Sequence, residues 1–327
     1  MFTTLSHLGI TVRLHNPHNM RGIQAARAQL PSIPHVAVFD TSFHSTIEEM
    51  IYLYPLPLEI SKQCGVRKYG FHGTSYGYVC SRLQDILTEA GEQRVRQVLV
   101  AHLGAGCSAA AVSVSPKSSS HQAESTGGII CRDTTMGYTP LDGLMMATRC
   151  GSIDPSILPN LAELMRDPNS SENGLSSVMD TLNKKSGLLG VSGVTADMRD
   201  ILSMAQSKPL VGDSQASERQ RRCQLALDMF SHRAAREMMA LTASLPGPVD
   251  CIVFTGGIGE MSGHVREKIL GHMKSCGHIQ LDASANLSNE SIVTNSTSSV
   301  QVYVIPTNEE LQIAREAYRL CTKEVSG

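Results

Sequence analysis

Residues 100–106 (VAHLGAG) and 253–260 (VFTGGIGE) share one pattern, an apolar run that ends in a glycine-rich turn. Short apolar runs bounded by glycine predict buried strands. Glycine lets the backbone approach a ligand closely, and a helix that starts after such a turn offers free N–H groups to an anion. A tight turn without a ligand explains either segment alone about equally well. Two of them indicate a duplicated fold that cradles a nucleotide.

The rest of the chain alternates between predicted strands and predicted helices. The expected strands are residues 36–40, 98–104, 109–114, 251–257 and 300–306. The expected helices, from their apolar periodicity, are residues 74–90, 141–148, 218–244 and 309–318, with another starting near Ser262. Serine-rich residues 113–125 predict a loop between two hairpin strands, and residues 208–217 a surface connection. Strands that alternate with helices favour an α/β chain.

Size, charge and cysteine spacing narrow the class of protein. A chain of 327 residues can hold two domains, and a net charge of -2 favours neither nucleic acid nor an anionic membrane as partner. The nine cysteines form no CxxC pair, which disfavours zinc and favours reduced thiols. The first residues lack a signal-peptide pattern, and no apolar run has the length of a membrane helix. We therefore expect a soluble, cytoplasmic protein.

Two segments place titratable side chains at predicted turns. Asp40 ends the apolar run VAVFD, and His72 lies between Phe71 and Gly73. An acid at a strand end and an imidazole at a glycine turn are parts of an electrostatic active site. His102 stands where the strand before the 104–106 turn stops, and a histidine there can equally be a satisfied structural residue.

Arg149 lies in the segment DTTMGYTPLDGLMMATRCGSIDP, residues 133–155, after a stretch expected to be helical. A guanidinium in this place can meet the charge that develops on a transferring phosphoryl group. The alternative is a surface ion pair with Asp142 or Asp154.

Two other charged positions have simple structural explanations. Asp197 follows a Gly/Ser turn and, with Arg199, can cap a helix. Glu309 opens the last predicted helix, where the helix dipole favours a carboxylate.

Taken in order, these segments from about residue 14 to residue 317 resemble the acetokinase family. The resemblance implies the actin-like ATPase (ribonuclease H-like) duplicated α/β fold. It implies a second, nucleotide-binding domain over residues 43–308 and a remnant of the first domain over residues 1–42 and 309–327. The family opens with an Asn/Ser-rich phosphate-binding hairpin and a substrate-binding arginine, and neither has a counterpart in this sequence. The expected first domain is therefore truncated.

The resemblance also implies a reaction, ATP plus acetate giving ADP plus acetyl phosphate, with Mg²⁺, and a homodimer. It assigns catalysis to Asp40, His72 and Arg149 and the metal to Glu309. It assigns the nucleotide to His102, Leu103, Gly104, Ala105, Gly106, Asp197, Met198, Arg199, Gly257, Ile258, Gly259, Glu260 and Met261. It assigns a small acetate pocket to Leu14, Phe71 and Pro140.

Three alternatives stay open at this point. The chain can be a weakly active or inactive fragment that retains nucleotide binding. Pyrophosphate can replace ATP as donor, because Ala105 and Met261 stand where the family has asparagine. A dinucleotide-binding oxidoreductase rests only on the glycine turns, which are a weak fingerprint. The sequence has no Walker loop, GxSxG or HExxH pattern.

Overall fold

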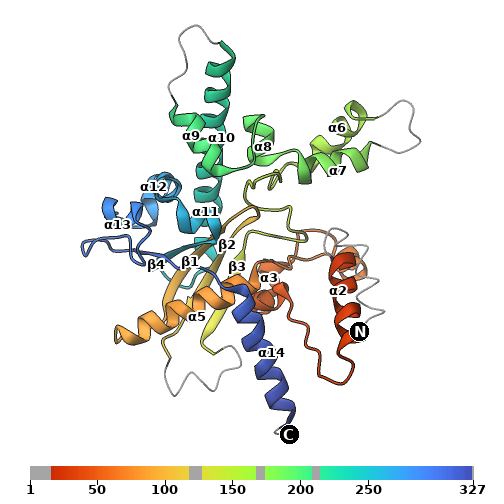
Figure 1. The fold of residues 1–327 in the computed structure, drawn as a ribbon, viewed down its shortest axis with the longest axis vertical. Coiled ribbons are helices and arrows are strands. Elements are labelled where there is room, and N and C mark those ends of the chain that lie inside the picture. Colours follow the sequence, from red (N-terminus) through yellow and green to blue (C-terminus); the bar gives the residue numbers. More distant parts are fainter. Residues whose placement is uncertain (1–15, 118–126, 167–173, 208–213, 326–327) are drawn as a thin grey trace. The chain divides into compact units, whose positions relative to one another are not determined.

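The structure, a computed structural model, describes residues 16–117, 127–166, 174–207 and 214–325. The chain forms two compact units, one of Met1–Phe39 with Glu310–Gly327 and one of Asp40–Glu309 (Figure 1). The described part of the first unit holds helix α2 (Asn16–Gln29) and helix α14, which spans Glu309–Val325 and begins at the last residue of the second unit. The second unit holds the sheet and all the residues of the candidate site that the structure describes.

A five-stranded sheet in the order β3-β2-β1-β4-β5 organises the second unit. Its strands are β1 (Arg96–Leu103), β2 (Cys107–Val114), β3 (Ile129–Thr134), β4 (Cys251–Thr255) and β5 (Gln301–Val304). β2 runs antiparallel to β1 and β3, whereas β1, β4 and β5 are parallel neighbours. Because β1 and β4 are paired and parallel, the turns that follow them lie at one edge of the sheet.

Helices cover both faces of this sheet, so its central strands are buried on both sides. Leu99, Ala101 and Leu103 of β1 pack into a core that includes α10 and α12. Val98 and Val100, which alternate with them, pack against α5 on the other face (Figure 1). This two-sided burial explains the continuous apolar runs in the sequence.

The remaining elements of the second unit are short, apart from α5 and α10. The α-helices are α3 (Glu49–Tyr52), α4 (Leu58–Cys64), α5 (Gly73–Glu89), α6 (Leu158–Leu164), α7 (Leu175–Lys184), α8 (Gly187–Ser192), α9 (Met198–Gln206), α10 (Ser214–Leu241), α11 (Gly256–Met261), α12 (Gly263–His272) and α13 (Ala283–Leu287). The 3-10 helices are η1 (Asp40–Thr46), η2 (Pro155–Ile157), η3 (Thr242–Ser244) and η4 (Lys274–Cys276).

Most of the predicted elements are confirmed. The expected strands 98–104, 109–114, 251–257 and 300–306 are β1, β2, β4 and β5. The expected helices 74–90, 218–244 and 309–318 are α5, α10 with η3, and α14, and Ser262 caps α12 by accepting a hydrogen bond from the Val265 amide. Much of the loop expected over residues 113–125 lies outside the described residues, as does most of the connection over 208–217.

Two predicted elements are wrong and one strand was missed. Residues 36–39 pair with no strand in the described part of the chain, and Phe39 is exposed, so this apolar run is not a buried strand. Residues 141–148 form a loop, because Gly143 has a φ of 93° and the Met146 amide donates forward to the Arg149 carbonyl. The missed strand, β3, lies at the sheet edge, where half-exposed Arg132 and Asp133 interrupt the apolar pattern.

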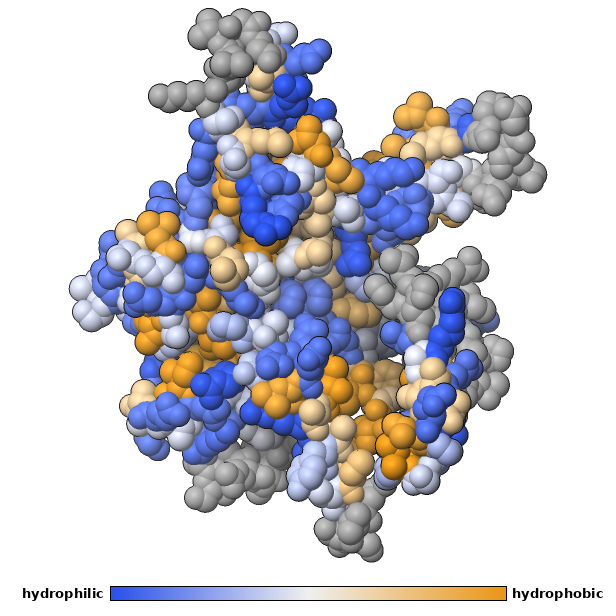
Figure 2. Space-filling model, in the orientation of Figure 1, coloured by the Kyte–Doolittle hydropathy of each residue, from blue (hydrophilic) through white to orange (hydrophobic). Residues whose placement is uncertain are grey.

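Apolar side chains also reach the surface of the second unit. Leu164 on α6 is 81% exposed, and Leu175 on α7 is also exposed. Figure 2 shows apolar and hydrophilic residues interspersed over this region. No helix among the described residues is both long enough and apolar enough to cross a membrane.

Candidate active site

Asp40 anchors the turn that carries His72. Its Oδ2 accepts a hydrogen bond from the His72 amide (3.0 Å), and its Oδ1 accepts from the Thr74 amide (3.0 Å) and hydroxyl (2.7 Å). Burial raises the pKa of the Asp40 carboxyl, but these hydrogen bonds with Thr74 and His72 outweigh it and hold the pKa below its usual value. A Cβ on Gly73 would lie 1.8 Å from the Asp40 carbonyl oxygen, so only glycine fits this contact. Asp40 is therefore a fixed anion that orients the start of α5.

His72 and His102 form a stacked pair beside the first glycine turn (residues 104–106). Their ring centroids lie 4.2 Å apart with an interplanar angle of 20°. Burial, and next the neighbouring His102, lower the pKa of His72 to about 3. Burial also lowers the pKa of His102 to about 4. Both imidazoles are therefore neutral at neutral pH.

The free nitrogens of this histidine pair face the first glycine turn. The Nδ1 atoms are occupied, His72 with the Ser108 hydroxyl and His102 with the Ser75 hydroxyl, each at 2.8 Å. A Cβ on Gly106 would lie 3.2 Å from Nε2 of His72 and 3.4 Å from Nη1 of Arg149. An imidazole nitrogen and a guanidinium thus both lie close to Gly106.

Arg149 is a half-buried cation with no carboxylate partner among the described residues. Its guanidinium lies 3.7 Å from the Met146 sulfur, and burial lowers its pKa below the usual value. The ion pairs considered from the sequence do not form, since Asp142 accepts from the Ser152 hydroxyl (2.6 Å) and Asp154 caps η2. A partly desolvated, unpaired cation favours an anionic ligand.

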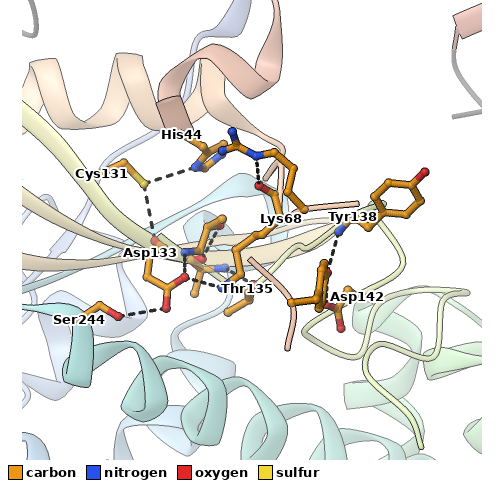
Figure 3. Close-up of polar contacts among 12 residues, drawn as sticks. His44, Lys68, Cys131, Asp133, Thr135, Tyr138, Asp142 and Ser244 are labelled. Atoms are coloured by element: carbon orange, nitrogen blue, oxygen red, sulfur yellow. Dashed lines mark hydrogen bonds and ion pairs between the residues drawn. The ribbon is translucent and has the colours of Figure 1, made fainter. Parts of the chain in front are cut away.

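The loop that carries Arg149 is held at several points (Figure 3). Asp133 pairs with Lys68 at 2.5 Å and accepts from the Ser244 hydroxyl at 3.1 Å. The Tyr138 amide donates to the Tyr54 hydroxyl at 2.9 Å. Further along the loop, the Ala147 amide donates to the carbonyl of Ala105 in the first glycine turn (3.2 Å). This last bond links the arginine loop to the turn that faces His72.

His44 was missed by the sequence reasoning and supports the residue before His72. Its Nε2 lies 3.0 Å from the Phe71 carbonyl, so this nitrogen carries the donated proton, and its Nδ1 lies 3.3 Å from the Cys131 sulfur. Burial lowers the pKa of His44 to about 4, which keeps the ring neutral. The sequence signal was weak, because a single histidine inside a short polar segment has no recognisable spacing.

Glu309 is the second carboxylate of the site. Burial and the nearby Asp40 raise its pKa. The described residues contain no group of three or more His, Cys, Asp or Glu side chains placed to hold a metal ion. Mg²⁺ needs only one or two carboxylates when phosphate oxygens and water complete its shell, and a cation would relieve the repulsion between Glu309 and Asp40. The residues present fit such an ion.

The second glycine turn (residues 256–259) starts helix α11 directly after β4. Gly256 has a φ of 76°, and a Cβ there would lie 2.8 Å from the Leu103 carbonyl oxygen. Oε1 of Glu260 accepts from the Gly256 amide (2.9 Å) and the Thr307 amide (3.0 Å). Gly257 is exposed, and the space where its side chain would be is open. A Cβ on Gly104 would lie 4.0 Å from the Gly257 nitrogen, so the two turns are neighbours.

The other predicted nucleotide residues divide into buried and exposed ones. Leu103 and Met198 are buried in the core, and Ile258 packs against it. Met261 is 72% exposed, and Ala105 is also exposed. The Asp197 side chain caps α9 and pairs with Arg199 at 2.5 Å in solvent. Within the described residues, the hydrogen bonds of the Asp197 and Arg199 side chains stay at this end of α9.

The predicted acetate pocket is described only in part. Leu14 lies outside the described residues. Phe71 packs against the core and Pro140 is half-buried. The amides of Tyr69 and Gly70 donate to the Gly137 carbonyl, at 3.0 Å and 3.4 Å, so the segments that carry Phe71 and Pro140 run close together.

An arginine without a carboxylate partner and two neutral imidazoles beside the first glycine turn, with a second glycine turn next to it, suit an α/β phosphotransferase. The family model of the acetokinase family matches residues 4–315. The chain belongs to this family.

Individual relatives agree with this assignment. Acetate kinase from Staphylococcus carnosus is 42% identical over 309 residues, 94% of this chain and 69% of the relative. Acetate kinase from Clostridium botulinum is 43% identical over 317 residues, 96% and 70% of the two chains. The fold is similar to that of Porphyromonas gingivalis acetate kinase, with a TM-score of 0.79, 34% identity and coverage of 98% and 72%. It is also similar to a Francisella tularensis propionate kinase, with a TM-score of 0.78, 37% identity and coverage of 95% and 71%.

These comparisons confirm the predicted family and the actin-like α/β fold. They also confirm the predicted enzyme class, an ATP-dependent kinase with a carboxyl group as acceptor, and they favour neither the inactive fragment nor the oxidoreductase.

Proposed function

We propose that this site transfers the γ-phosphoryl group of ATP to acetate, giving acetyl phosphate and ADP. An acetate oxygen attacks the γ-phosphorus, the bond from that phosphorus to the β–γ bridging oxygen breaks, and ADP leaves. The acceptor is already a carboxylate, so no side chain has to remove a proton. This agrees with Asp40, whose oxygens are committed to the turn before α5.

Arg149 and His72 stabilise the transferring group in this proposal. Phosphoryl transfer depends on positioning and on donors to the equatorial oxygens. The single observation that carries the proposal is the convergence of Nε2 of His72 and Nη1 of Arg149 on Gly106 of the first glycine turn. Asp40 acts through the turn that it holds, because its hydrogen bonds set the orientation of His72.

The two neighbouring glycine turns take the nucleotide in this proposal. The exposed backbone at Gly257, which neighbours Gly104, suits a close approach by phosphates. Asp197 and Arg199 contact the nucleotide from the start of α9. ATP, rather than pyrophosphate, is proposed as donor because the family relatives are named acetate kinases.

Glu309 holds Mg²⁺, which neutralises phosphate charge when bound, and Asp40 adds a second negative charge nearby. Leu14, Phe71 and Pro140 select a short acyl chain by size. One methylene changes such selectivity by about 1–3 kcal/mol. The division into domains at residues 42/43 and 308/309, a homodimer and a cytoplasmic setting rest on the family resemblance alone.

The test is acyl phosphate formation from acetate, ATP and Mg²⁺, trapped with hydroxylamine. The wild-type chain should form product, and Arg149→Ala should not. Arg82→Ala is the matched control, because Arg82 is an arginine on α5 that pairs in solvent with Asp85. Absence of product with the wild type, together with thermal stabilisation by ATP, would support the fragment instead. Formation of product with pyrophosphate in place of ATP would identify pyrophosphate as a phosphoryl donor.

A further inference from the structure

We propose that Tyr76 and Ser108 form a hydrogen-bond chain that fixes His72 as the neutral tautomer with its proton on Nε2. The chain would make His72 a permanent donor toward the space that it shares with Arg149. Tyr76 and Ser108 are positioning residues in this proposal, since they act through His72. The inference rests on the proposed function, in which His72 donates to the transferring phosphoryl group.

The geometry of the chain comes from three elements of the second unit. Nδ1 of His72 lies 2.8 Å from the Ser108 hydroxyl on β2, and this hydroxyl lies 2.5 Å from the Tyr76 hydroxyl on α5. The Tyr76 amide donates to the His72 carbonyl at 2.9 Å, so the tyrosine lies one helical turn after the histidine. Ser108 and Tyr76 are both fully buried.

Counting hydrogens decides the direction of this chain. A tyrosine hydroxyl has one proton, and within the described residues the Ser108 oxygen is the only acceptor in contact with the Tyr76 hydroxyl. If Tyr76 donates to Ser108, the serine proton is free to point at Nδ1 of His72, and the ring proton then sits on Nε2. If Nδ1 carried the proton, Ser108 would accept from His72 and could then either donate to Tyr76 or accept from Tyr76 as well. In the first case the buried tyrosine proton lacks an acceptor, and in the second the buried serine proton does, which costs about 1–3 kcal/mol.

Two other features support the same assignment. Burial raises the pKa of Tyr76 well above its usual value, so the hydroxyl keeps its proton. The stacked ring of His102 and the cation of Arg149 both disfavour a charged His72. A neutral ring donates from only one nitrogen, so the tautomer determines whether His72 can donate to a phosphoryl oxygen at all.

The direct test is heteronuclear NMR of the histidine ring nitrogens in the whole isotope-labelled chain, assigned with a His72→Gln variant. We expect a protonated Nε2 and an unprotonated Nδ1 for His72 in the wild type. A protonated Nδ1 in the wild type overturns the proposal. This measurement needs no turnover. If the protein shows the expected tautomer but forms no acetyl phosphate, only the proposed function is overturned. If the protein is active but shows the other tautomer, only this inference is overturned.

Variants of the chain add a kinetic test. In Ser108→Ala, His72 loses its fixed donor, and we expect both tautomers and a fall in kcat of about tenfold or more with little change in KM. Ser108→Thr keeps the hydroxyl and should retain the wild-type tautomer. Tyr76→Phe should raise the fraction protonated on Nδ1 and lower kcat severalfold. An unchanged tautomer in both Ser108→Ala and Tyr76→Phe would overturn the proposal.

The matched control is Ser113→Ala. Ser113 is another buried serine of β2, and its hydroxyl donates to the Gln97 side chain at 2.9 Å, away from the histidine pair. This variant should lose stability without any change in the His72 tautomer or in kcat. If Ser113→Ala lost as much kcat as Ser108→Ala, the kinetic effect would reflect folding. That result would also count against the hydrogen-bond chain from Tyr76 through Ser108 to His72.

Discussion

The two glycine turns look alike in the sequence but differ in what surrounds them. The first turn (residues 104–106) closes a hairpin between antiparallel β1 and β2 and faces His72, His102 and Arg149. The second turn (residues 256–259) leads from β4 into α11 and is tied by Glu260 and by the buried Arg266, whose guanidinium donates to the Gly259 carbonyl at 2.8 Å and to the Asn286 side chain at 2.9 Å. In the proposed function, the first turn serves the transferring group and the second the rest of the nucleotide.

The physical origin of this difference is the element that follows each turn, strand β2 after the first and helix α11 after the second. At the first turn the chain returns along the sheet, so β2 brings Ser108 under His72. At the second turn the chain enters a helix, and the left-handed Gly256 packs against the Leu103 carbonyl. We therefore expect an added side chain at the first turn to lower activity and an added side chain at the second turn to lower stability. Variants at the two turns separate these two effects.

The largest effect is expected for Arg149→Ala, which removes the unpaired cation from the first turn. Loss of a guanidinium on a transferring phosphoryl group lowers kcat by about a thousandfold or more. Arg149→Lys should recover only part of the activity, because a lysine lacks the planar fork. Steady-state kinetics of acetyl phosphate formation measure both variants. Retention of a tenth of the wild-type kcat by Arg149→Ala would contradict the assigned role.

Gly256→Ala should affect stability strongly. The φ of 76° and the 2.8 Å approach to the Leu103 carbonyl both penalise a side chain. We expect a loss of about 2–4 kcal/mol in the free energy of unfolding, or roughly 5–15 °C in Tm. Gly257→Ala is the control, since its Cβ would meet nothing within 4 Å. Equal Tm values for the two variants would show that the second turn is not limited by its backbone.

At the first turn, Gly106→Ala should lower activity and leave stability nearly unchanged. Its Cβ would lie 3.2 Å from Nε2 of His72 and 3.4 Å from Arg149, so it intrudes on the proposed reaction space without a left-handed φ. We expect kcat to fall by about ten- to a hundredfold. The free energy of unfolding should change by less than about 1 kcal/mol. Kinetics and urea unfolding test this pair of expectations, and a variant with normal kcat would place the reaction elsewhere.

Acid should destabilise the chain through its buried imidazoles. The pKa values of His44 and His102 are about 4 and that of His72 about 3 in the folded chain, below the unfolded value of 6.5. The unfolded state therefore binds protons first, and stability falls as pH drops from 6.5 toward 4. Each imidazole should account for roughly 1–2 kcal/mol by about pH 5. Urea unfolding across this range measures the loss, and a flat profile would contradict neutral burial.

The smallest effect on stability is expected for Arg199→Ala, on α9, outside both glycine turns. Arg199 pairs with Asp197 in solvent, and such exposed pairs contribute little to stability. Its Tm should therefore stay near that of the wild type. Because Arg199 is a proposed nucleotide contact, Arg199→Ala should raise the KM for ATP severalfold and leave kcat unchanged. A KM for ATP equal to the wild-type value would leave this pair a helix cap alone.

Sequence patterns predicted a strand or helix correctly where its burial followed one local rule. The apolar runs predicted β1, β2, β4 and β5, because central strands buried on both faces allow few polar residues. They failed at residues 36–40, where an apolar run is not buried, and at β3, where an edge strand carries charges. They also failed at residues 141–148, because the loop depends on Gly143 and on forward bonds that a periodic pattern does not reveal.

The candidate site shows the same limit. Asp40, His72, His102 and Arg149 were singled out from the sequence, but their roles depended on distance. Asp40 was expected to take part in catalysis, and the structure shows that it orients the turn before α5 through three hydrogen bonds. Arg149 could have been paired, and the described residues leave it without a carboxylate. Ser108 and Tyr76 gave no signal, since their chemistry appears only when a buried hydroxyl meets a ring nitrogen.

The sequence by itself determined the family, the alternation of strands and helices, and the two glycine turns. These features depend on neighbouring residues and on segment order, which are present in the sequence. Only the tertiary structure decided that His72, His102 and Arg149 meet at the first turn, and that both imidazoles are neutral. Burial and contact arise from segments far apart in the chain, and they set the charge and hydrogen bonding of each side chain.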